Sequence, residues 1–308
     1  MAEKPLLVVI DGNSVIHRAF HALPPLSTKT GQIVSAVYGF LLVFLKAVRE
    51  LQPTYFVACF DTPKPTFRHQ KFKEYKAKRP PTPEDIKSQI PLVKDVLAGF
   101  GVLFFEKEGF EADDVIGTIC DSARRQDPQA EIAILSGDLD SLQLVGPSTK
   151  VYFLKKGVKE TVWYDEKGVE ERYSGLVPSQ LVDFKALRGD PSDNIPGVKG
   201  VGEKTAIKLI REYGSLENLY AGIGKKDCSL PASLKEKLAE NRTEAFLSRE
   251  LAQIERAVPI DFDLERCRWG KYDRETVVEI LQKFEFHSLI NKLPGAPKVG
   301  SDNNLRLW

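Results

Sequence analysis

The sequence predicts an α/β protein with a central, mostly parallel sheet. Two observations lead to this fold class. Short apolar runs rich in β-branched or aromatic residues have the length of buried strands, and they occupy residues 6–10, 54–60, 102–105 and 131–135. Segments with apolar residues at helical spacing separate them, at 32–50, 83–100 and 111–126. Alternation of strands and helices is typical of a parallel sheet covered by helices on both faces.

The remaining segments complete the expected organisation. Residues 150–164 suggest a hairpin or edge strands, and from about residue 178 the pattern is helical, with a glycine-rich turn at 197–202. A basic insertion bracketed by prolines interrupts the alternation at 62–83. We therefore expect an α/β domain over 1–175 with an insertion at about 62–100, a helical region over 176–293, and a loose polar tail over 294–308.

Composition narrows the class of protein. With 308 residues, 42% of them hydrophobic and 28% charged, the chain can bury a substantial core and matches ordinary soluble proteins. Its four cysteines are far apart and show no CxxC spacing, which argues against a disulfide framework or a zinc site and favours a reducing compartment. The first apolar run ends at Asp11, and no run approaches the roughly 20 apolar residues of a membrane span. We expect a cytoplasmic protein without a membrane partner.

Charge is segregated along the chain although the net charge is only +1. Residues 64–79 contain seven Lys or Arg residues, one His and a single acid, Glu74. The acids gather elsewhere, at the ends of apolar runs. A near-neutral protein with this distribution can hold cations in one place and a polyanion beside it.

Acidic residues follow three of the predicted strands. Asp11, Asp61 and Asp138 each stand just past a buried run. In open parallel sheets, ligands bind outside the carboxyl ends of the strands, so we expect these three carboxylates at one edge. Asp140 would point to the same side as Asp138 if the chain stays extended there.

Two further groups of acids show a spacing of three. Glu111 and Asp114 begin a predicted helix and share one of its faces, with Asp113 adjacent, and Asp190 and Asp193 repeat the spacing. Each acid alone is explained as well by a turn or a helix cap. Nine together are not, because crowded carboxylates repel unless cations lie among them. An all-oxygen ligand set without paired His or Cys favours Mg²⁺ or Mn²⁺.

Five motifs in order and spacing resemble a known family. They are VIDGNSVIHRAFHALPPL, CFDTPKPTFRHQKFKEYKAKRPPTPEDI, GFEADDVIGT, LSGDLDSLQLV and LRGDPSDNIPGVKGVGEKTA. They are similar to the 5′-nuclease domain of bacterial DNA polymerase I, and more distantly to bacteriophage 5′-exonucleases and eukaryotic flap endonucleases. The resemblance covers roughly residues 5–290. It implies a PIN-like α/β domain with a helical arch and a C-terminal helical region containing a helix–hairpin–helix.

The resemblance also implies how the acids are used. It places Asp11, Asp61, Glu111, Asp113 and Asp138 in a first metal cluster, and Asp114, Asp140, Asp190 and Asp193 in or near a second. Two or more metal ions would then activate water as the nucleophile and stabilise the attacking and leaving oxygens of a phosphodiester. This chemistry needs many carboxylates and no nucleophilic Ser or Cys. The histidines (His17, His21, His69 and His287) show no ligand spacing, and we expect them to be structural or surface residues.

The basic insertion provides the expected phosphate contacts. By the same resemblance, Lys76 and Arg79 contact the scissile phosphate from one helical face, Arg68 assists them, and Tyr75 stacks on a base. The alternatives are a solvated basic face for the charges and packing within the arch for Tyr75.

The segment GVKGVGEKTAIKLI resembles a helix–hairpin–helix, within about 193–211. Backbone N–H groups at the start of such a helix bind phosphate without reading sequence. We expect Lys199, Gly200, Gly202 and Lys204 to contact substrate here, and family members often hold a monovalent cation such as K⁺ on these carbonyls. A plain glycine-capped helical turn is the alternative.

The expected function is therefore a metal-dependent, structure-specific 5′-nuclease that cuts DNA at 5′ ends and flaps. Its expected substrates are 5′ flaps, nicked or gapped duplexes and RNA primers, in primer removal and repair. We expect a monomer, either fused to or associated with a DNA polymerase. Two alternatives remain: a PIN-type ribonuclease, which usually lacks the arch and the hairpin, and a DNA-binding module without chemistry, which would have lost several carboxylates.

Overall fold

A computed structural model describes residues 4–225 and 228–294. Its centre is a six-stranded sheet in the order β3-β2-β1-β4-β5-β6. Adjacent strands are parallel except β5 and β6, which form an antiparallel hairpin at the edge. The strands are β1 (Leu6–Asp11), β2 (Tyr55–Cys59), β3 (Leu103–Phe105), β4 (Glu131–Ser136), β5 (Thr149–Lys156) and β6 (Glu160–Tyr164). The predicted mostly parallel sheet and its edge hairpin are confirmed.

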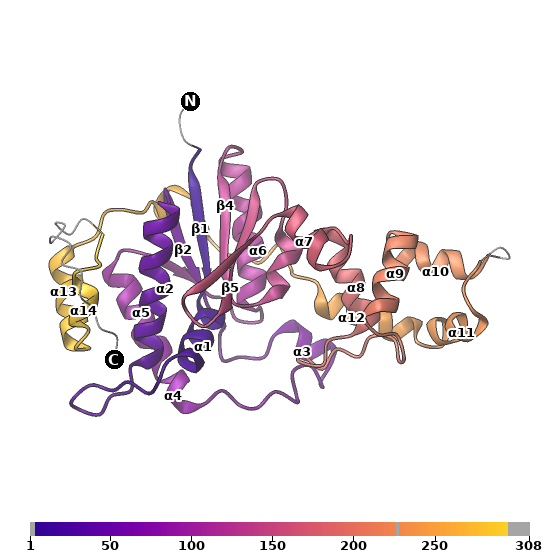
Figure 1. The fold of residues 1–308 in the computed structure, drawn as a ribbon, viewed down its shortest axis with the longest axis horizontal. Helices are drawn as coiled ribbons and strands as arrows, with labels where there is room; N and C mark the ends of the chain where they lie inside the picture. Colours follow the sequence, from indigo (N-terminus) through magenta and orange to yellow (C-terminus); the bar gives the residue numbers. More distant parts are fainter. Residues whose placement is uncertain (1–3, 226–227, 295–308) are drawn as a thin grey trace.

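Helices cover both faces of this sheet (Figure 1). Alternate residues of β1 enter different cores, because successive side chains in a strand point to opposite faces. Leu7 and Val9 pack with α6, whereas Val8 and Ile10 pack with α1, α2 and α5. These helices are α1 (Gly12–Ala22), α2 (Ser35–Leu51), α4 (Glu84–Lys87), α5 (Gln89–Gly99) and α6 (Ala112–Gln126). The predicted helix at 83–100 is thus divided into α4 and α5, and α1 was not predicted.

A helical region extends from one side of the sheet (Figure 1). Within it α8 packs against both α9 and α12, and α9 packs against α10. The backbone N–H of Leu216 donates to the buried carboxylate of Asp183 at 3.0 Å, which ties the start of α10 to α8. The elements are α7 (Glu166–Arg172), η2 (Pro178–Gln180), α8 (Leu181–Arg188), α9 (Glu203–Tyr213), α10 (Leu216–Ile223), α11 (Ala232–Glu240) and α12 (Arg242–Ala252).

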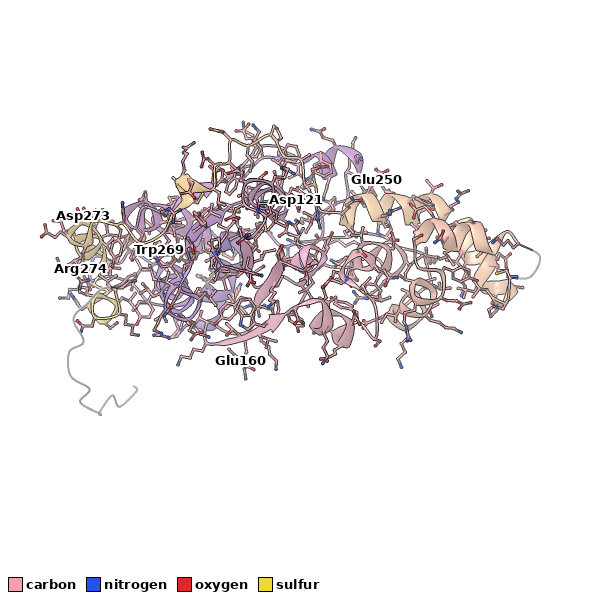
Figure 2. The ribbon with its side chains drawn as sticks, turned by 90° about the horizontal axis from the view of Figure 1, so that it is seen from above. Asp121, Glu160, Glu250, Trp269, Asp273 and Arg274 are labelled. Carbon is pink, nitrogen blue, oxygen red and sulfur yellow. The ribbon has the colours of Figure 1, made fainter. Side chains whose placement is uncertain are left out.

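The C-terminal segment returns to the sheet domain, contrary to the expected helical unit over 176–293. It contains η3 (Glu265–Cys267), α13 (Arg274–Lys283) and α14 (His287–Ile290), and α13 packs against α5. The ring of Trp269 lies 5.5 Å from that of Phe44, and its backbone N–H donates to Thr54 at 2.9 Å. Trp269 and Arg274 therefore lie at the end of the molecule opposite α9–α11 (Figures 1 and 2). The expected loose tail lies outside the described residues from position 295 onward.

The basic insertion is less helical than the predicted arch. Only α3 (Phe67–Lys71) is a helix, and turns follow it as far as residue 79. Lys76 has a left-handed backbone, with φ of 56°, and its N–H donates to the carbonyl of Asp193 at 2.8 Å. Lys76 and Arg79 therefore do not share a helical face. Nowhere in residues 4–225 and 228–294 is a helix both long and apolar enough to cross a membrane.

Candidate active site

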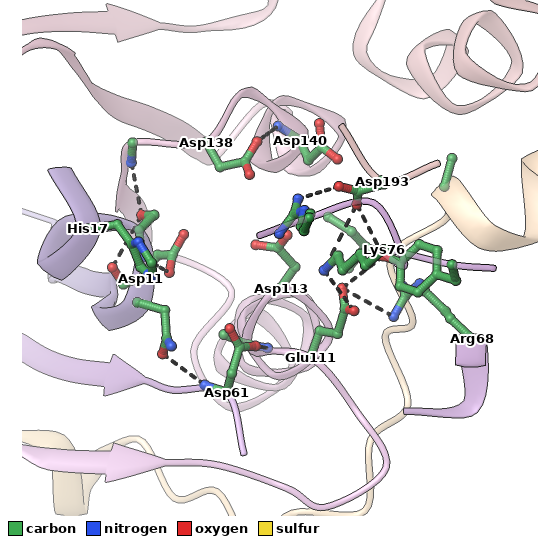
Figure 3. A pocket seen from close by; sticks show the side chains of 18 of the residues that line it. Asp11, His17, Asp61, Arg68, Lys76, Glu111, Asp113, Asp138, Asp140 and Asp193 are labelled. Carbon is green, nitrogen blue, oxygen red and sulfur yellow. Dashed lines mark hydrogen bonds and ion pairs between the residues drawn. The ribbon is translucent and has the colours of Figure 1, made fainter. Parts of the chain in front are cut away.

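The carboxyl ends of β1, β2 and β4 meet at a cavity of about 430 Å³. The register puts these ends level, since Ile10 lies opposite Ala58 on one side and Leu135 on the other. Figure 3 shows the carboxylates converging on this space from separate segments. The predicted residues that line it are Asp11, Asp61, Arg68, Tyr75, Lys76, Arg79, Glu111, Asp113, Asp138, Asp140 and Asp193.

Asp11 and Asp61 are both fixed by backbone amides of neighbouring segments. Asp11 ends β1 and caps α1, accepting from the Ser14 N–H at 3.1 Å and from the Ser136 hydroxyl at 2.8 Å. Asp61 accepts from the Ala112 N–H at 2.8 Å, at the start of α6. Loss of solvation within the cavity raises the pKa of both carboxyls despite these hydrogen bonds. Their orientation is thus set by the fold, and their charge is left facing the cavity.

The three acids at the start of α6 have different surroundings. Asp114 caps the start of α6, where its carboxylate accepts from the Glu111 N–H at 2.9 Å. Asp114 is completely buried and does not line the cavity. Its expected role in a metal cluster stays a prediction, and in this structure its carboxylate caps the helix and pairs with Arg68 at 2.7 Å.

Asp113 instead lies in the middle of the carboxylates (Figure 3). No hydrogen bond or ion pair within the described residues engages its side chain. Burial raises its pKa well above the usual value, and the charges of Asp11, Asp138 and Asp140 raise it further. Such a carboxylate is stabilised by a cation.

Asp138 and Asp140 flank the start of a 3₁₀ helix, η1 (Leu139–Leu144), and not an extended segment. Both still line the cavity. Asp138 caps η1 by accepting from the Asp140 N–H at 2.9 Å. Burial raises the pKa of Asp138. The pKa of Asp140 is raised by burial to about 6, although the Lys185 ammonium pairs with its carboxylate and opposes the shift.

Asp190 and Asp193 also differ. Asp193 is buried and lines the cavity, where its carboxylate pairs with Arg79 and accepts from the Tyr75 hydroxyl at 3.2 Å. Asp190 lies outside the cavity lining and pairs with Lys185 at 2.8 Å. Burial opposes ionisation of Asp190, but Lys185 and Ser192 outweigh it and lower its pKa to about 2. Lys185 therefore bridges Asp190 and Asp140.

Lys76 and Arg79 reach into the same cavity and pair with its acids. The Lys76 ammonium lies 2.8 Å from Glu111 and 3.9 Å from Asp193. Burial disfavours its charged form, yet these carboxylates prevail and raise its pKa. Arg79 is more exposed and also donates to the Ser192 carbonyl at 3.1 Å. Both cations therefore lie beside the carboxylates, as a phosphate-binding role requires.

Arg68 and Tyr75 line the cavity, but both side chains are almost completely buried. The Arg68 side chain is 3% exposed, and its guanidinium donates to Asp114 and to backbone carbonyls of Leu251 and Gln253. The Tyr75 ring is 3% exposed and its hydroxyl donates to Glu111 and Asp193. Direct phosphate contact by Arg68 and base stacking by Tyr75 stay predictions, and in this structure protein groups engage the polar atoms of both side chains.

The hairpin residues lie away from the cavity. Lys199, Gly200, Gly202 and Lys204 are exposed, and Gly202 caps the start of α9, where an added Cβ would meet no atom within 4 Å. Gly197 has φ of 64° and lies against Gly189, where a Cβ would approach the Gly189 nitrogen to 2.3 Å. The tight glycine turn therefore presents the start of α9 to solvent.

Several cavity residues were not predicted. Asn13, Ser14, His17, Arg18 and His21 line it from α1, and Gln143 lines it from η1. Arg18 donates to the Gly137 carbonyl at 2.8 Å, beside Asp138. For the α1 residues, the available signal was their position within about three turns of Asp11, since a helix that begins at a site keeps one face toward it.

The described part of the chain contains no group of three or more His, Cys, Asp or Glu side chains already arranged to hold a metal ion. The acids surround one cavity, but Glu111 and Asp193 are engaged by Lys76, Tyr75 and Arg79. The carboxylates would have to draw closer to share an ion.

Comparison with known proteins decides the family. The family model described as "5'-3' exonuclease, N-terminal resolvase-like domain" matches residues 6–174, and "5'-3' exonuclease, C-terminal SAM fold" matches residues 176–275. The chain belongs to the 5′-3′ exonuclease family. It is accordingly a nuclease, and the PIN-type ribonuclease and the module without chemistry are set aside.

Similar curated proteins include DNA polymerase I from two Bacillus species. The chain is 43% identical over 290 residues to DNA polymerase I of Bacillus caldotenax, covering 94% of this chain and 32% of the relative. It is 41% identical over 297 residues to DNA polymerase I of Bacillus subtilis, covering 95% and 33%. The chain therefore spans about a third of the length of these relatives.

Solved structures with the same fold share little sequence. The T5 D15 protein co-crystallised with metal ions has a TM-score of 0.65 at 19% identity, covering 92% of this chain and 98% of that one. The catalytic core of Rad2 in complex with DNA substrate has a TM-score of 0.62 at 19% identity, covering 94% and 93%. At these identities the likeness establishes the fold alone, and it agrees with the predicted PIN-like architecture.

Proposed function

We propose that this chain is a divalent-metal-dependent, structure-specific 5′-nuclease that hydrolyses DNA phosphodiesters at 5′ ends and flaps. One observation carries the proposal: seven carboxylates from separate segments face one cavity that Lys76 and Arg79 also enter. The family membership supports hydrolysis of a nucleic-acid strand, and the solved neighbours include proteins crystallised with metal ions and with DNA substrate.

The residues fit a hard divalent cation. Asp11 is buried, Asp113 and Asp138 are half-buried, and the pKa of each carboxyl is raised; Asp113 pairs with no cation within the described residues. Oxygen ligands of this kind suit Mg²⁺ or Mn²⁺. A pair of such ions, when bound, activates water and stabilises the attacking and leaving oxygens. Asp11, Asp61, Glu111, Asp113 and Asp138 would hold the first ion, and Asp140 and Asp193, with Asp190 nearby, would hold the second.

Lys76 and Arg79 bind and orient the scissile phosphate. Their present partners, Glu111 and Asp193, are expected metal ligands. The Lys76 and Arg79 side chains can therefore each exchange a carboxylate for a phosphate oxygen without leaving the cavity. Arg offers two donors in a fixed plane and Lys a point charge, which together suit the equatorial oxygens. Asp61 and Asp11 keep their orientation through the Ala112 and Ser14 amides.

The hairpin holds the duplex at a distance from the chemistry. Gly202 and the exposed residues Lys199 and Lys204 surround the start of α9, where free backbone N–H groups attract phosphate. Contacts of this kind position a duplex without reading its sequence. A site for cleavage joined to a separate duplex anchor would favour junctions, such as flaps and nicks, over free single strands.

Cleavage of 5′-labelled substrates tests the proposal. A flap, a nicked duplex and a single strand are each incubated with Mg²⁺ and with excess chelator. Rapid Mg²⁺-dependent release of the 5′ segment from flap and nick is expected, with slow cleavage of the single strand. Asp138→Asn serves as the inactive control, and cleavage by that variant at the wild-type rate would misplace the site.

Several finer expectations remain predictions of this proposal. They are K⁺ at the hairpin, action on RNA primers in primer removal and repair, a monomeric state, a cytoplasmic location, and fusion to or association with a DNA polymerase. The last is supported by the DNA polymerase I relatives, of which the chain spans about a third.

A further inference from the structure

A short strap crosses the wall of the cavity after α12. We define the strap as residues 251–255, and three of them, Leu251, Ala252 and Ile254, line the cavity. The strap forms no strand or helix with its neighbours beyond the end of α12 at Ala252. Something other than regular secondary structure must therefore fix its path.

Three buried side chains bind five successive residues of the strap through their backbone. Arg68 donates to the carbonyl of Leu251 at 2.9 Å and to that of Gln253 at 2.7 Å. Gln143, 7% exposed, donates to the carbonyl of Ala252 at 3.0 Å and accepts from the N–H of Ile254 at 3.2 Å. Asp114 accepts from the N–H of Glu255 at 2.8 Å.

Each of these side chains belongs to a segment that carries a reacting group. Asp114 follows Asp113 and accepts from the N–H of Glu111 at 2.9 Å. Gln143 lies in η1, three residues beyond Asp140. Arg68 lies in the basic insertion that leads to Lys76 and Arg79, and it joins Asp114 through two hydrogen bonds of 2.7 and 2.8 Å. The strap is therefore bound by all three of the segments that carry reacting groups.

The strap also continues from the helical region. In α12 the buried hydroxyl of Ser248 accepts from the N–H of Gly197, in the hairpin turn, at 2.9 Å. Because α12 packs against α8, the helix from which the strap continues is held in place. It therefore holds the cavity in a fixed position relative to the hairpin.

We propose that Arg68, Asp114 and Gln143 are positioning residues, which clamp the strap and so set Glu111, Asp138 and Lys76 in register for cleavage. The inference rests on the proposed nuclease function. It gives Arg68 and Asp114 a role distinct from phosphate or metal contact, because the Arg68 fork and the Asp114 carboxylate are already occupied by protein groups. Displacing reacting groups by a fraction of an ångström slows chemistry without weakening binding elsewhere.

Gln143→Leu is the first test, since it keeps the side-chain volume and removes both hydrogen bonds to the strap. At saturating enzyme, the single-turnover rate on a 5′ flap should fall about 10- to 10²-fold. The dissociation constant for the flap, measured in excess chelator, should change by less than about twofold. The Mg²⁺ concentration for half the maximal rate should also stay the same.

Thr118→Val is the matched control. The buried Thr118 hydroxyl accepts from the N–H of Val258 at 3.0 Å, beyond the strap, and donates to the backbone carbonyl of Asp114 at 2.8 Å. The variant therefore loses two hydrogen bonds, as Gln143→Leu does, but keeps every side-chain hydrogen bond to residues 251–255. Its Tm should fall about as much as that of Gln143→Leu while its cleavage rate stays within about twofold of wild type. Equal slowing of both variants would mean general destabilisation and would overturn the proposal.

Arg68→Lys and Asp114→Asn separate positioning from direct contact. Lys keeps the charge that a phosphate contact needs but lacks the fork that binds two carbonyls and a carboxylate. Folded Arg68→Lys should therefore be as slow as Gln143→Leu, and a near wild-type rate would overturn the proposal. An increased Mg²⁺ requirement in Asp114→Asn would do the same, by making it a metal ligand. Where either variant fails to fold, Gln143→Leu decides.

A wild-type protein that leaves the flap intact would refute the proposed function itself, whereas equal cleavage by wild type and Gln143→Leu would refute only the positioning role.

Discussion

The Lys76 ammonium and the Glu111 carboxylate lie 2.8 Å apart, although they belong to different segments with opposite expected partners. Lys76 is the residue expected to bind a phosphate, and Glu111 is expected to bind a metal ion. Their pairing neutralises both charges inside a cavity where an unpaired charge is costly. In the protein without substrate, Lys76 therefore takes the place of the metal ion expected beside Glu111, and Glu111 takes the place of the phosphate expected beside Lys76.

Lys76→Ala should slow the chemical step more than it weakens binding. The charge of Lys76 matters most where negative charge builds in the transition state, so the single-turnover rate should fall about 10²-fold or more. Other Lys and Arg residues share the phosphate load, so flap affinity should change little and the salt slope by at most about one unit. Rapid-quench cleavage and a binding titration over a range of salt concentrations measure both quantities.

Lys71→Ala is the control for that experiment. Lys71 lies in the same basic insertion but pairs with Glu250 at 2.7 Å on the surface, outside the cavity lining. Lys71→Ala should weaken flap binding slightly and leave the single-turnover rate unchanged. Equal, small and salt-dependent losses of affinity in both variants, with unchanged rates, would show that the insertion is only a solvated binding face.

The sequence predicted the positions of the acids better than their individual roles. Strand ends are visible in a sequence, because apolar runs are followed by polar residues, and so Asp11, Asp61 and Asp138 were placed at one edge. The difference between Asp113 and Asp114 was not visible. Both start the same helix, and only the position of Arg68, from another segment, makes one a cap and leaves the other in the cavity.

Long-range contacts explain the other differences. The basic insertion has helical spacing in its sequence, yet the N–H of Lys76 donates to Asp193, and turns replace the helix. Residues 264–293 look like the end of a helical region, but Trp269 packs against Phe44 in the sheet domain. Partners more than 100 residues away override local propensity in both places, and no local pattern records them.

Cleavage should depend on Mg²⁺ or Mn²⁺, whereas Ca²⁺ should support binding without cleavage. The expected metal ligands facing the cavity are carboxylates, which bind all three ions, but Ca²⁺ accepts looser geometry and more ligands. Flap cleavage and flap binding are measured in parallel with each ion after removal of metal by chelator. Full activity in excess chelator would contradict the two-metal mechanism.

Asp113→Asn should stabilise the metal-free protein, and more so at pH 8 than at pH 5. The pKa of Asp113 is raised by burial and by Asp11, Asp138 and Asp140, so its ionised form costs stability. That cost is absent below the unfolded value near 3.8 and grows as pH rises toward the folded pKa. An amide cannot ionise and avoids it at every pH.

Thermal unfolding in chelator measures this difference. The Tm of Asp113→Asn should exceed that of wild type by at least about 2 °C at pH 8. The gap should narrow toward pH 5, where the wild-type carboxyls take up protons. With Mg²⁺ added, the order should reverse, because the ion stabilises the wild-type protein by binding its folded state. A gap that is constant with pH would mean that the repulsion among these acids is not relieved by protonation.

Gly202→Asp should weaken duplex binding and spare the chemical step. Gly202 caps α9, outside the cavity lining, and a carboxylate there would repel the phosphate that the free N–H groups attract. Gly202→Ala is the matched control, because φ is −88° at this position and a Cβ would meet no atom within 4 Å. The alanine variant should bind flap DNA nearly as wild type does, so any loss in the aspartate variant reports charge and not shape.

At saturating enzyme the single-turnover rate of Gly202→Asp should recover to the wild-type value. A rate that stays low at saturation would show that the hairpin acts on the cavity itself, and a dissociation constant unchanged by the new charge would place the duplex elsewhere.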